Sequence, residues 1–172
     1  MKQTRATAWC SSAGIAGNAQ LRLFLPNSEI KKIGYWSSPA ANSNVIGWGN
    51  KPNTLKAQAF AKKHDLPYVR LEDGFIGYLG HSSSDTKRLS LIKDELGIYY
   101  DARSSSRLER LCLAIGSIDF PASEEKRACD LIRSVTSIGI SKYNHIRESL
   151  PTNIQQLGSG CILLVDQTAG DQ

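Results

Sequence analysis

Two adjacent carboxylates close an apolar run in the stretch Arg70-Leu71-Glu72-Asp73-Gly74-Phe75. We predict a strand over residues 68–71 that delivers Glu72 and Asp73 at its C-terminal end. Open α/β sheets bind their ligands at the carboxyl ends of their strands, so both side chains are candidate acid–base or substrate-orienting groups. The alternative for the same pair is a turn or a helix cap.

Strands and helices alternate on both sides of this stretch. The run Val45-Ile46-Gly47-Trp48-Gly49 is short, apolar and ends in glycine, which is typical of a buried strand. Asn53-Thr54 is expected to cap a helix that begins at Leu55, is rich in helix formers and ends before Asp65-Leu66-Pro67. A strand, a helix and a second strand in succession predict an α/β fold.

Further elements are expected toward both ends of the chain. Ser106, with Glu109 three residues later, is a signature of a helix N-terminus, and the apolar residues of 123–138 recur at helical spacing. The remaining expectations are a turn leading into a helix that Pro26-Asn27 ends, a short strand within 30–36, a loop over 77–88, and a hairpin of 89–93 with 98–100.

The C-terminal end joins the apolar run Cys161-Ile162-Leu163-Leu164-Val165 to the polar segment 166–172. That combination is typical of the opening of a βα unit, whose strand needs further chain to cover it. We therefore expect an N-terminal, acceptor-side Rossmann-like subdomain over 1–158, and the first strand and turn of a nucleotide-binding subdomain over 159–172. On this interpretation the sequence is a fragment, truncated at the start of the second half.

Composition and charge narrow the class of protein. The chain has 172 residues, of which 41% are hydrophobic and 22% charged, and this suits one domain with a buried core. No apolar run approaches the ~20 residues that span a bilayer, and no apolar segment follows Lys2 and Arg5 as an export signal requires, so we expect a cytoplasmic location. The net charge of +5 comes from scattered bases, which favour a solvated face or anionic substrates and lipid headgroups over nucleic acid.

The four cysteines are widely spaced, and none forms a CxxC or a Cys/His pattern. Free thiols in a reducing compartment are therefore expected, and no metal or cofactor is predicted. The four positions are Cys10, Cys112, Cys129 and Cys161.

Six motifs occur along the chain in one order and with sensible spacing. Together they resemble the first glycosyltransferase module of the capsular polysaccharide synthesis and export family, over nearly the whole chain. Members of that family are retaining β-Kdo transferases that build the Kdo linker of Gram-negative capsules on a lipid. The motifs are Trp48-Gly49-x-Lys51-Pro52, Leu66-Pro67-x-x-Arg70-Leu71-Glu72-Asp73-Gly74-Phe75, Leu89-Ser90-Leu91, Gly97-Ile98-Tyr99-Tyr100-Asp101, Ser141-Lys142-Tyr143-Asn144 and Val165-Asp166-Gln167-Thr168-x-x-Asp171.

The resemblance implies a GT-B-like architecture of two Rossmann-like halves with the site in the cleft between them. The donor would be CMP-Kdo, and the acceptor a lipid that already carries Kdo or the growing Kdo chain. The sugar-nucleotide half would lie beyond Gln172. By the same resemblance, Asp171 is the candidate nucleophile.

Retention of anomeric configuration needs two displacements or a front-face attack. A double displacement uses one carboxylate as nucleophile and a second acid–base group, roughly 5 Å apart in retaining glycosidases. Asp171 could supply the first group, and Glu72 or Asp73 the second. Because Kdo is a keto acid, its anomeric carbon carries a carboxylate that a cationic side chain could bind. The candidates for that contact, or for a phosphate, are Lys51, Arg70 and Lys142.

The remaining candidate substrate contacts lie in the same motifs. Trp48 could instead be a core residue, Asp166 a strand-end cap, and the segment 142–144 the end of a helix. These candidates are Trp48, Gly49, Gly74, Ser90, Tyr100, Tyr143, Asn144, Asp166 and Gln167.

Two positions depart from the family pattern. After Glu-Asp-Gly-Phe the family usually continues with Leu-Arg-Ser, whereas this chain has Ile76-Gly77-Tyr78 and lacks there a basic residue that could hold a phosphate or carboxylate. Arg88 stands where a proline is common before Leu-Ser-Leu. Both changes bear on the specificity for acceptor or linkage.

Two classes of function stay open. The first is the N-terminal half of a Kdo transferase, inactive alone, with a sugar nucleotide and a lipid-linked saccharide acceptor as partners. The alternative is a non-catalytic glycolipid-binding or scaffolding module of capsule assembly. Either role is compatible with contacts to other capsule assembly proteins and with peripheral contact at the inner membrane.

Overall fold

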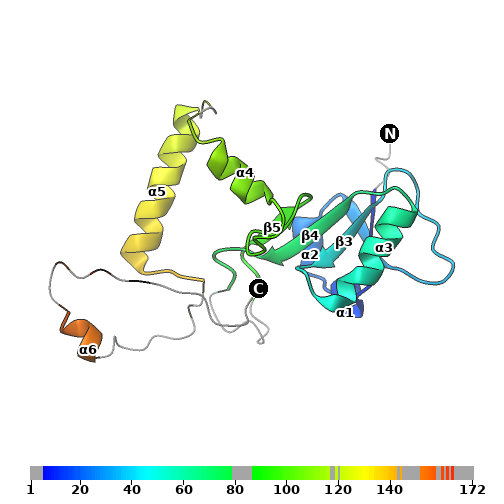
Figure 1. Cartoon of the computed structure of the whole chain (residues 1–172), viewed down its shortest axis with the longest axis horizontal. Helices are drawn as coiled ribbons and strands as arrows, with labels where there is room; N and C mark the ends of the chain where they lie inside the picture. The colour runs from blue at the N-terminus through cyan, green and yellow to red at the C-terminus, as the bar shows by residue number, and fades with distance from the viewer. Residues whose placement is uncertain are drawn as a thin grey trace.

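A five-stranded sheet with the order β2-β1-β3-β4-β5 lies at the centre of the fold (Figure 1). The computed structural model describes residues 6–78, 87–116, 119, 121–142, 144, 152–157, 160, 162 and 164. The first four strands in the sequence run parallel to one another, and the last pairs antiparallel at the edge. The strands are β1 (Ala6–Cys10), β2 (Ser28–Lys32), β3 (Asn44–Trp48), β4 (Tyr68–Asp73) and β5 (Leu91–Asp94).

Helices cover both faces of the sheet. The short helices α1 (Ala13–Ala16) and α2 (Leu21–Phe24) follow β1 and contact β1 and β2 on one face. On the other face, α3 (Leu55–Lys63) follows the 3₁₀ turn η1 (Pro52–Thr54) and packs on β3 and β4. The result is a three-layered α/β/α arrangement, as the alternation of elements predicts.

Side-chain alternation along the strands divides the core into two clusters. On β3, Ile46 belongs to the cluster beneath α1 and α2, whereas Val45 belongs to the cluster beneath α3. Both side chains are fully buried. A strand apolar on both faces needs cover on both sides, which explains why the parallel part of the sheet is sandwiched.

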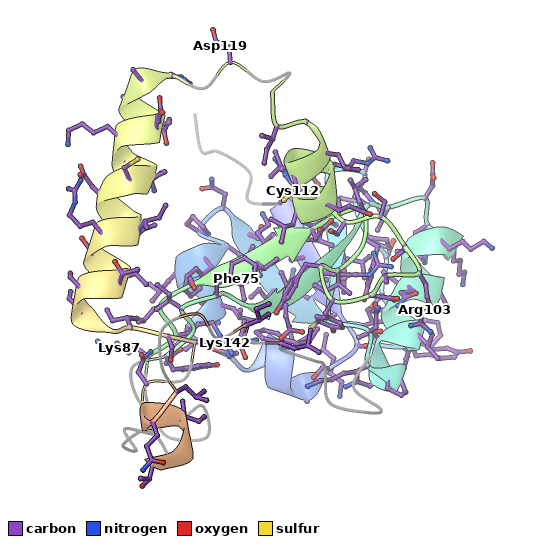
Figure 2. The ribbon with its side chains drawn as sticks, turned by 60° about the vertical axis from the view of Figure 1, so that its left-hand side comes forward. Phe75, Lys87, Arg103, Cys112, Asp119 and Lys142 are labelled. Atoms are coloured by element: carbon purple, nitrogen blue, oxygen red, sulfur yellow. The ribbon has the colours of Figure 1, made fainter. Side chains whose placement is uncertain are left out.

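Three further helices are α4 (Arg107–Leu113), α5 (Ala122–Ile138) and α6 (Thr152–Gln155). The first two lead away from the sheet, as Figure 1 shows. The capping box expected at Ser106 is complete: its hydroxyl accepts from the backbone N–H of Glu109, and the Glu109 side chain accepts from the backbone N–H of Ser106. No residue of α5 is buried, and in Figure 2 its side chains project into open space.

The sequence patterns identify the elements around the carboxylate pair correctly. A buried strand over β3, the helix α3, a strand that delivers Glu72 and Asp73, and the helices α4 and α5 are all confirmed. The α/β fold class is confirmed as well. The short strand expected within 30–36 is present, but it begins and ends earlier, as β2.

Two expectations about secondary structure are wrong, and one strand was not expected. The expected hairpin is absent, because β5 pairs with β4, with Leu91 opposite Asp73. The Asp94 carboxylate accepts hydrogen bonds from the backbone N–H groups of Leu96 and Gly97, which turns the chain away from the sheet. Strand β1 was not anticipated. Thr54 does not cap α3 with its hydroxyl, which donates to the Lys51 carbonyl instead.

The expected loop and C-terminal strand fall partly outside the described residues. Residues 79–86 of the loop and most of 161–165 belong to that part. Of the expected strand, the structure describes Ile162 and Leu164, and both are exposed and outside any strand. Neither of them belongs to the five-stranded sheet.

Candidate active site

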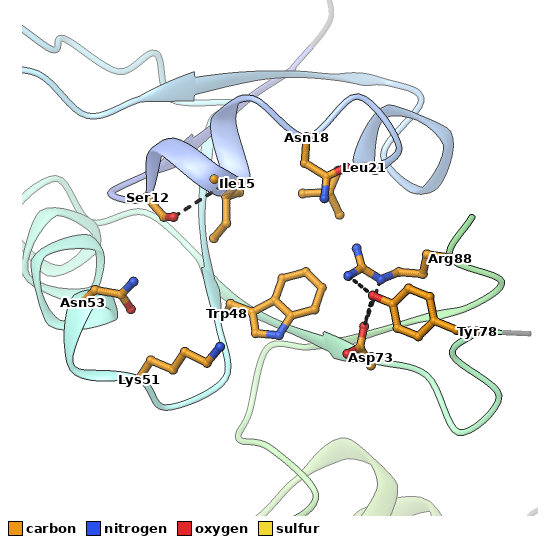
Figure 3. A pocket seen from close by; sticks show the side chains of 11 residues that line it. Ser12, Ile15, Asn18, Leu21, Trp48, Lys51, Asn53, Asp73, Tyr78 and Arg88 are labelled. Atoms are coloured by element: carbon orange, nitrogen blue, oxygen red, sulfur yellow. Dashed lines mark hydrogen bonds and ion pairs between the residues drawn. The ribbon is translucent and has the colours of Figure 1, made fainter. Parts of the chain in front are cut away.

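A pocket of about 360 Å³ opens at the carboxyl ends of β1, β3 and β4 (Figure 3). The turn between β1 and α1 supplies Ser12, the end of β3 supplies Trp48, and the end of β4 supplies Asp73. This edge is where parallel sheets place their ligands. Within the described part of the chain the lining residues are Ser12, Gly14, Ile15, Asn18, Leu21, Trp48, Lys51, Asn53, Asp73, Tyr78 and Arg88.

Asp73 is the carboxylate that faces this pocket. Its Oδ1 accepts a hydrogen bond from the Tyr78 hydroxyl at 3.1 Å and forms an ion pair with Nε of Arg88 at 2.9 Å. Arg88 also donates through Nη2 to the Tyr78 hydroxyl, which closes a three-residue cluster (Figure 3). Burial, followed by the neighbouring Asp73 charge, raises the pKa of Tyr78, so its phenol stays protonated and can donate at neutral pH.

Glu72 turns to a different set of partners. Its Oε1 accepts hydrogen bonds from Trp48 Nε1 at 3.1 Å and from the backbone N–H of Asp73 at 3.0 Å. Its Oε2 accepts from the Tyr100 hydroxyl at 3.4 Å. Burial is the main cause that raises the pKa of Tyr100, and Glu72 adds to it. Glu72 therefore fixes the indole that lines the pocket and is not itself among the lining residues.

Two glycines of the motifs are required by close packing. Gly49 has φ +55°, a left-handed conformation, and a Cβ there would meet Glu72 Oε2 at 2.9 Å and the Tyr100 hydroxyl. A Cβ on Gly74 would collide with the Ser90 side chain. Ser90 in turn donates to the Ile76 carbonyl at 2.6 Å, so these residues hold the backbone after β4 rather than line the pocket.

Arg70 lies in a separate cluster outside the pocket lining. Its Nε donates to Asn50 Oδ1 at 3.3 Å, and Asn50 Nδ2 donates to Asp101 Oδ2 at 2.6 Å. The Arg103 side chain donates to the Asp101 carboxylate and holds its pKa below the usual range. Of the cations proposed for an anionic group, Lys51 therefore lines the pocket and Arg70 does not.

The fifth motif reaches the neighbourhood through two side chains. Lys142 Nζ lies 3.4 Å from the Tyr99 hydroxyl. Asn144 Nδ2 donates to the Tyr78 carbonyl at 2.9 Å, which ties residues far apart in sequence to the end of the pocket. The other candidates of the last two motifs lie outside the described residues: Tyr143, Asp166, Gln167 and Asp171.

Several pocket residues could not be identified from the sequence as residues of a functional site. Ser12, Asn18 and Asn53 are polar residues of turns, and only the topology brings them to the ends of β3 and β4. Arg88 and Tyr78 stood out only as departures from a motif. The structure places the Arg88 guanidinium beside Asp73, so the basic group missing after Phe75 has a counterpart from another segment.

Within the part of the chain that the structure describes, no group of three or more His, Cys, Asp and Glu side chains is arranged to hold a metal ion. Among the same residues, no helix is long and apolar enough to cross a membrane. Cys10, Cys112 and Cys129 are free thiols, as expected.

Known proteins resemble this chain over most of its length. The profile of a family described as capsule polysaccharide biosynthesis proteins matches residues 43–156. The capsule polysaccharide modification protein LipA of Neisseria meningitidis serogroup A is 37% identical over 166 residues, which cover 95% of this chain and 23% of LipA. The lipopolysaccharide-processing protein LpsZ of Rhizobium meliloti is 36% identical over 99 residues, 58% of this chain and 22% of LpsZ. The chain thus spans less than a quarter of the length of these curated relatives.

Solved structures agree with the fold. Thermosulfurimonas dismutans KpsC, a β-Kdo 2,4 transferase, matches with a TM-score of 0.66 and 34% identity, over 86% of this chain and 46% of that chain. The KpsC β-Kdo 2,7 transferase matches with a TM-score of 0.53 and 24% identity, over 77% of this chain and 43% of that chain, and supports the fold alone. The first match confirms the expected relation of this α/β unit to part of a glycosyltransferase.

Proposed function

Because this chain belongs to the capsule polysaccharide biosynthesis protein family, we propose that it forms the acceptor-side part of a retaining transferase that moves Kdo from CMP-Kdo to a lipid-linked Kdo acceptor. The observation that carries the proposal is the pocket at the carboxyl ends of β3 and β4, with Asp73, Lys51 and Arg88 in its wall. Homology to a Kdo transferase at 34% identity supports the choice of sugar.

The contacts of the two carboxylates support different roles. The Asp73 side chain contacts the described residues through Oδ1, so Oδ2 can accept a hydrogen bond from a substrate hydroxyl. Both oxygens of Glu72 already accept hydrogen bonds, and Glu72 is therefore a positioning residue for Trp48 and Tyr100. In a double displacement Asp73 would be the acid–base or orienting group.

The remaining roles follow from the family relation and are part of the same proposal. Asp171 would be the nucleophile, with Asp166 and Gln167 beside it in sequence at the start of a nucleotide-binding half. Tyr143 and Asn144 would contact the acceptor. The positive charge of the chain suits peripheral contact with an anionic inner-membrane surface, where a lipid-linked acceptor is presented from the cytoplasmic side.

The test is Kdo transfer by the full product of the reading frame that encodes this chain. The wild-type product should transfer Kdo from CMP-Kdo to a synthetic lipid-linked Kdo acceptor, and Asp171→Asn should abolish transfer while the circular-dichroism spectrum is retained. Full activity of Asp171→Asn would exclude it as the nucleophile. Acceptor binding without any transfer would favour the alternative, a non-catalytic glycolipid-binding or scaffolding module.

The division of labour between two halves has its own test. The 172-residue chain should be inactive alone and bind CMP weakly or not at all, because the nucleotide would be held by the other half. Micromolar binding of CMP in calorimetry would contradict this arrangement. Titration of the same chain with acceptor saccharide provides the matched measurement, and there binding is expected.

A further inference from the structure

The side chain of Arg88 is only 10% exposed and is held in place on three sides. Its Nε pairs with Asp73 Oδ1 at 2.9 Å, its Nη2 donates to the Tyr78 hydroxyl, and its guanidinium carbon lies 4.4 Å from the centre of the Trp48 ring. The backbone N–H of Arg88 donates to Gln20 Oε1 at 3.0 Å, which also anchors the main chain. The guanidinium is therefore pre-organised, and little ordering remains for a ligand to impose.

One nitrogen of this guanidinium takes no part in these contacts. Nη1 of Arg88 is buried and has no hydrogen-bond partner among the residues that the structure describes. Most buried donors in native proteins have a partner, and an unmet one next to a cavity indicates a missing acceptor. In Figure 3 the free end of the guanidinium points into the pocket, toward Asn18 and Leu21. Other unpartnered buried atoms among the described residues, such as Trp9 Nε1 and Tyr68 OH, belong to residues that do not line this pocket.

A second cation faces the same space. Lys51 is exposed, lines the pocket, and extends toward it from the turn after β3 in Figure 3. It forms no ion pair with a described residue, whereas Asp73 neutralises Arg88. Two positive charges and one negative charge leave the pocket wall with an excess of one positive charge, which suits a singly charged anion.

From this arrangement we infer that Arg88 Nη1 and Lys51 Nζ bind a singly charged oxyanion of the saccharide substrate in this pocket. Two chemical sources carry such a group: the carboxylate of an acidic sugar and the phosphodiester of a lipid-linked acceptor. Ser12, Asn18 and Asn53 add neutral hydrogen-bonding groups for hydroxyls, and a volume of about 360 Å³ lies within the range of small-molecule sites. The oxyanion site stands on the geometry, and only the assignment to a saccharide rests on the proposed function.

The experiment titrates the isotope-labelled 172-residue chain with two probes and follows the Trp48 indole N–H and the Arg88 Nε–H by NMR. The methyl glycoside of Kdo presents a carboxylate, and glycerophosphoglycerol presents a phosphodiester. Saturable shifts of both signals with one probe identify the source of the oxyanion. The methyl ester of the Kdo glycoside, which lacks the charge, should bind at least about tenfold more weakly than the acid if the carboxylate is the bound group.

Matched variants separate charge recognition from folding. Lys51→Gln changes an exposed side chain and should weaken binding of the charged probe on the order of tenfold, whereas Lys56→Gln, an exposed lysine on α3 outside the pocket, should leave it unchanged. Arg88→Lys keeps the charge but replaces the three separate nitrogens of the planar guanidinium with a single ammonium nitrogen on a shorter side chain, so it should also weaken binding.

Three outcomes would overturn all or part of the inference. Equal binding of the Kdo glycoside and its ester, with no response to glycerophosphoglycerol, would exclude an oxyanion site. Wild-type affinity in both Lys51→Gln and Arg88→Lys would exclude these two residues. Binding of glycerophosphoglycerol alone would exclude the sugar carboxylate and support the phosphodiester. None of these results depends on the transfer assay, which tests the proposed function separately.

Discussion

The indole Nε1 of Trp48 donates a hydrogen bond to Oε1 of Glu72 at 3.1 Å and so joins the ends of the neighbouring strands β3 and β4. The other oxygen of Glu72 accepts from Tyr100, which brings a residue of a distant turn to the same point. Glu72, a candidate acid–base group by its motif, thus also holds the Trp48 and Tyr100 side chains in place.

Glu72→Ala should lower the free energy of unfolding by about 1–3 kcal/mol, because it leaves the partly buried Trp48 and Tyr100 donors without their acceptor. Glu72→Gln keeps one oxygen and the shape of the side chain and should lose less. Urea unfolding followed by circular dichroism measures both. Glu29→Ala, which removes an exposed carboxylate on β2, is the control and should change little. Equal losses in Glu72→Ala and Glu29→Ala would contradict the organising role.

Gly49→Ala should destabilise the fold twice over. A left-handed φ of +55° costs a residue with a Cβ about 1–2 kcal/mol, and the contact with Glu72 and the Tyr100 hydroxyl adds about 1–3 kcal/mol of overpacking. Urea unfolding measures the sum. Gly14→Ala, where a Cβ would meet only Ser12 Oγ at 3.6 Å, should be near neutral.

The same substitution can be partly rescued. Tyr100→Phe removes the hydroxyl that the new Cβ would meet, so Gly49→Ala should cost less in a Tyr100→Phe background than in the wild type. A cost that is identical in both backgrounds would mean that the Tyr100 hydroxyl is not responsible, and would leave the backbone conformation and the Glu72 contact as the causes.

The stability should fall at alkaline pH through Tyr78 and Tyr100. Burial raises the pKa of both phenols, whereas in the unfolded chain they titrate near about 10. Between these values the unfolded state binds fewer protons than the folded state, so the free energy of unfolding decreases as the pH rises. The contribution is complete below about pH 10 and is lost as the pH passes the folded pKa. Urea unfolding across this range should show a shallower decline in the Tyr78→Phe/Tyr100→Phe double variant, and an unchanged slope would contradict the assignment.

The spacing of apolar residues and the signals at helix ends were sufficient to predict those elements that are determined by their own residues. The apolar run of β3, the apolar spacing of α5 and the Ser106–Glu109 pair each contain their signal locally. Strand β1 was missed because Ala6–Cys10 is built of small and mixed residues, and its burial comes from the strands on both sides. The expected hairpin is absent for a related reason. Strand β5 pairs along its whole length with β4, and not with the residues that follow the turn after Asp94.

The candidate site shows the same limit. The sequence indicated the two carboxylates and placed them correctly at a strand end. The sequence could not show which of the two carboxylates faces the pocket. The side chains of Glu72 and Asp73 point to different hydrogen-bond partners, and those partners come from other parts of the chain. Arg88 pairs with Asp73 across 15 positions of sequence, and no local pattern announces such a pair.

The cysteines should differ in reactivity. Burial raises the pKa of the Cys10 thiol and shields it, whereas Cys112 and Cys129 lie exposed on α4 and α5. Brief treatment of the native chain with iodoacetamide near neutral pH should modify Cys112 and Cys129 and spare Cys10, which should react after denaturation. Peptide mass spectrometry reads out each site. Rapid modification of Cys10 in the native chain would mean that the core between β1 and α1 opens readily.

The ion pair of Asp73 with Arg88 should show strong coupling, because the two side chains are only 26% and 10% exposed. Asp73→Ala leaves a nearly buried guanidinium without its partner and should cost about 2–3 kcal/mol of unfolding free energy. The double variant Asp73→Ala/Arg88→Met removes the stranded charge together with its partner, so its loss should be smaller than the sum of the two single losses by about 1–2 kcal/mol. The exposed pair of Glu29 with Lys31 is the reference cycle and should be close to additive. Additive losses at Asp73 and Arg88 would show that the guanidinium is held by Trp48 and Tyr78 instead.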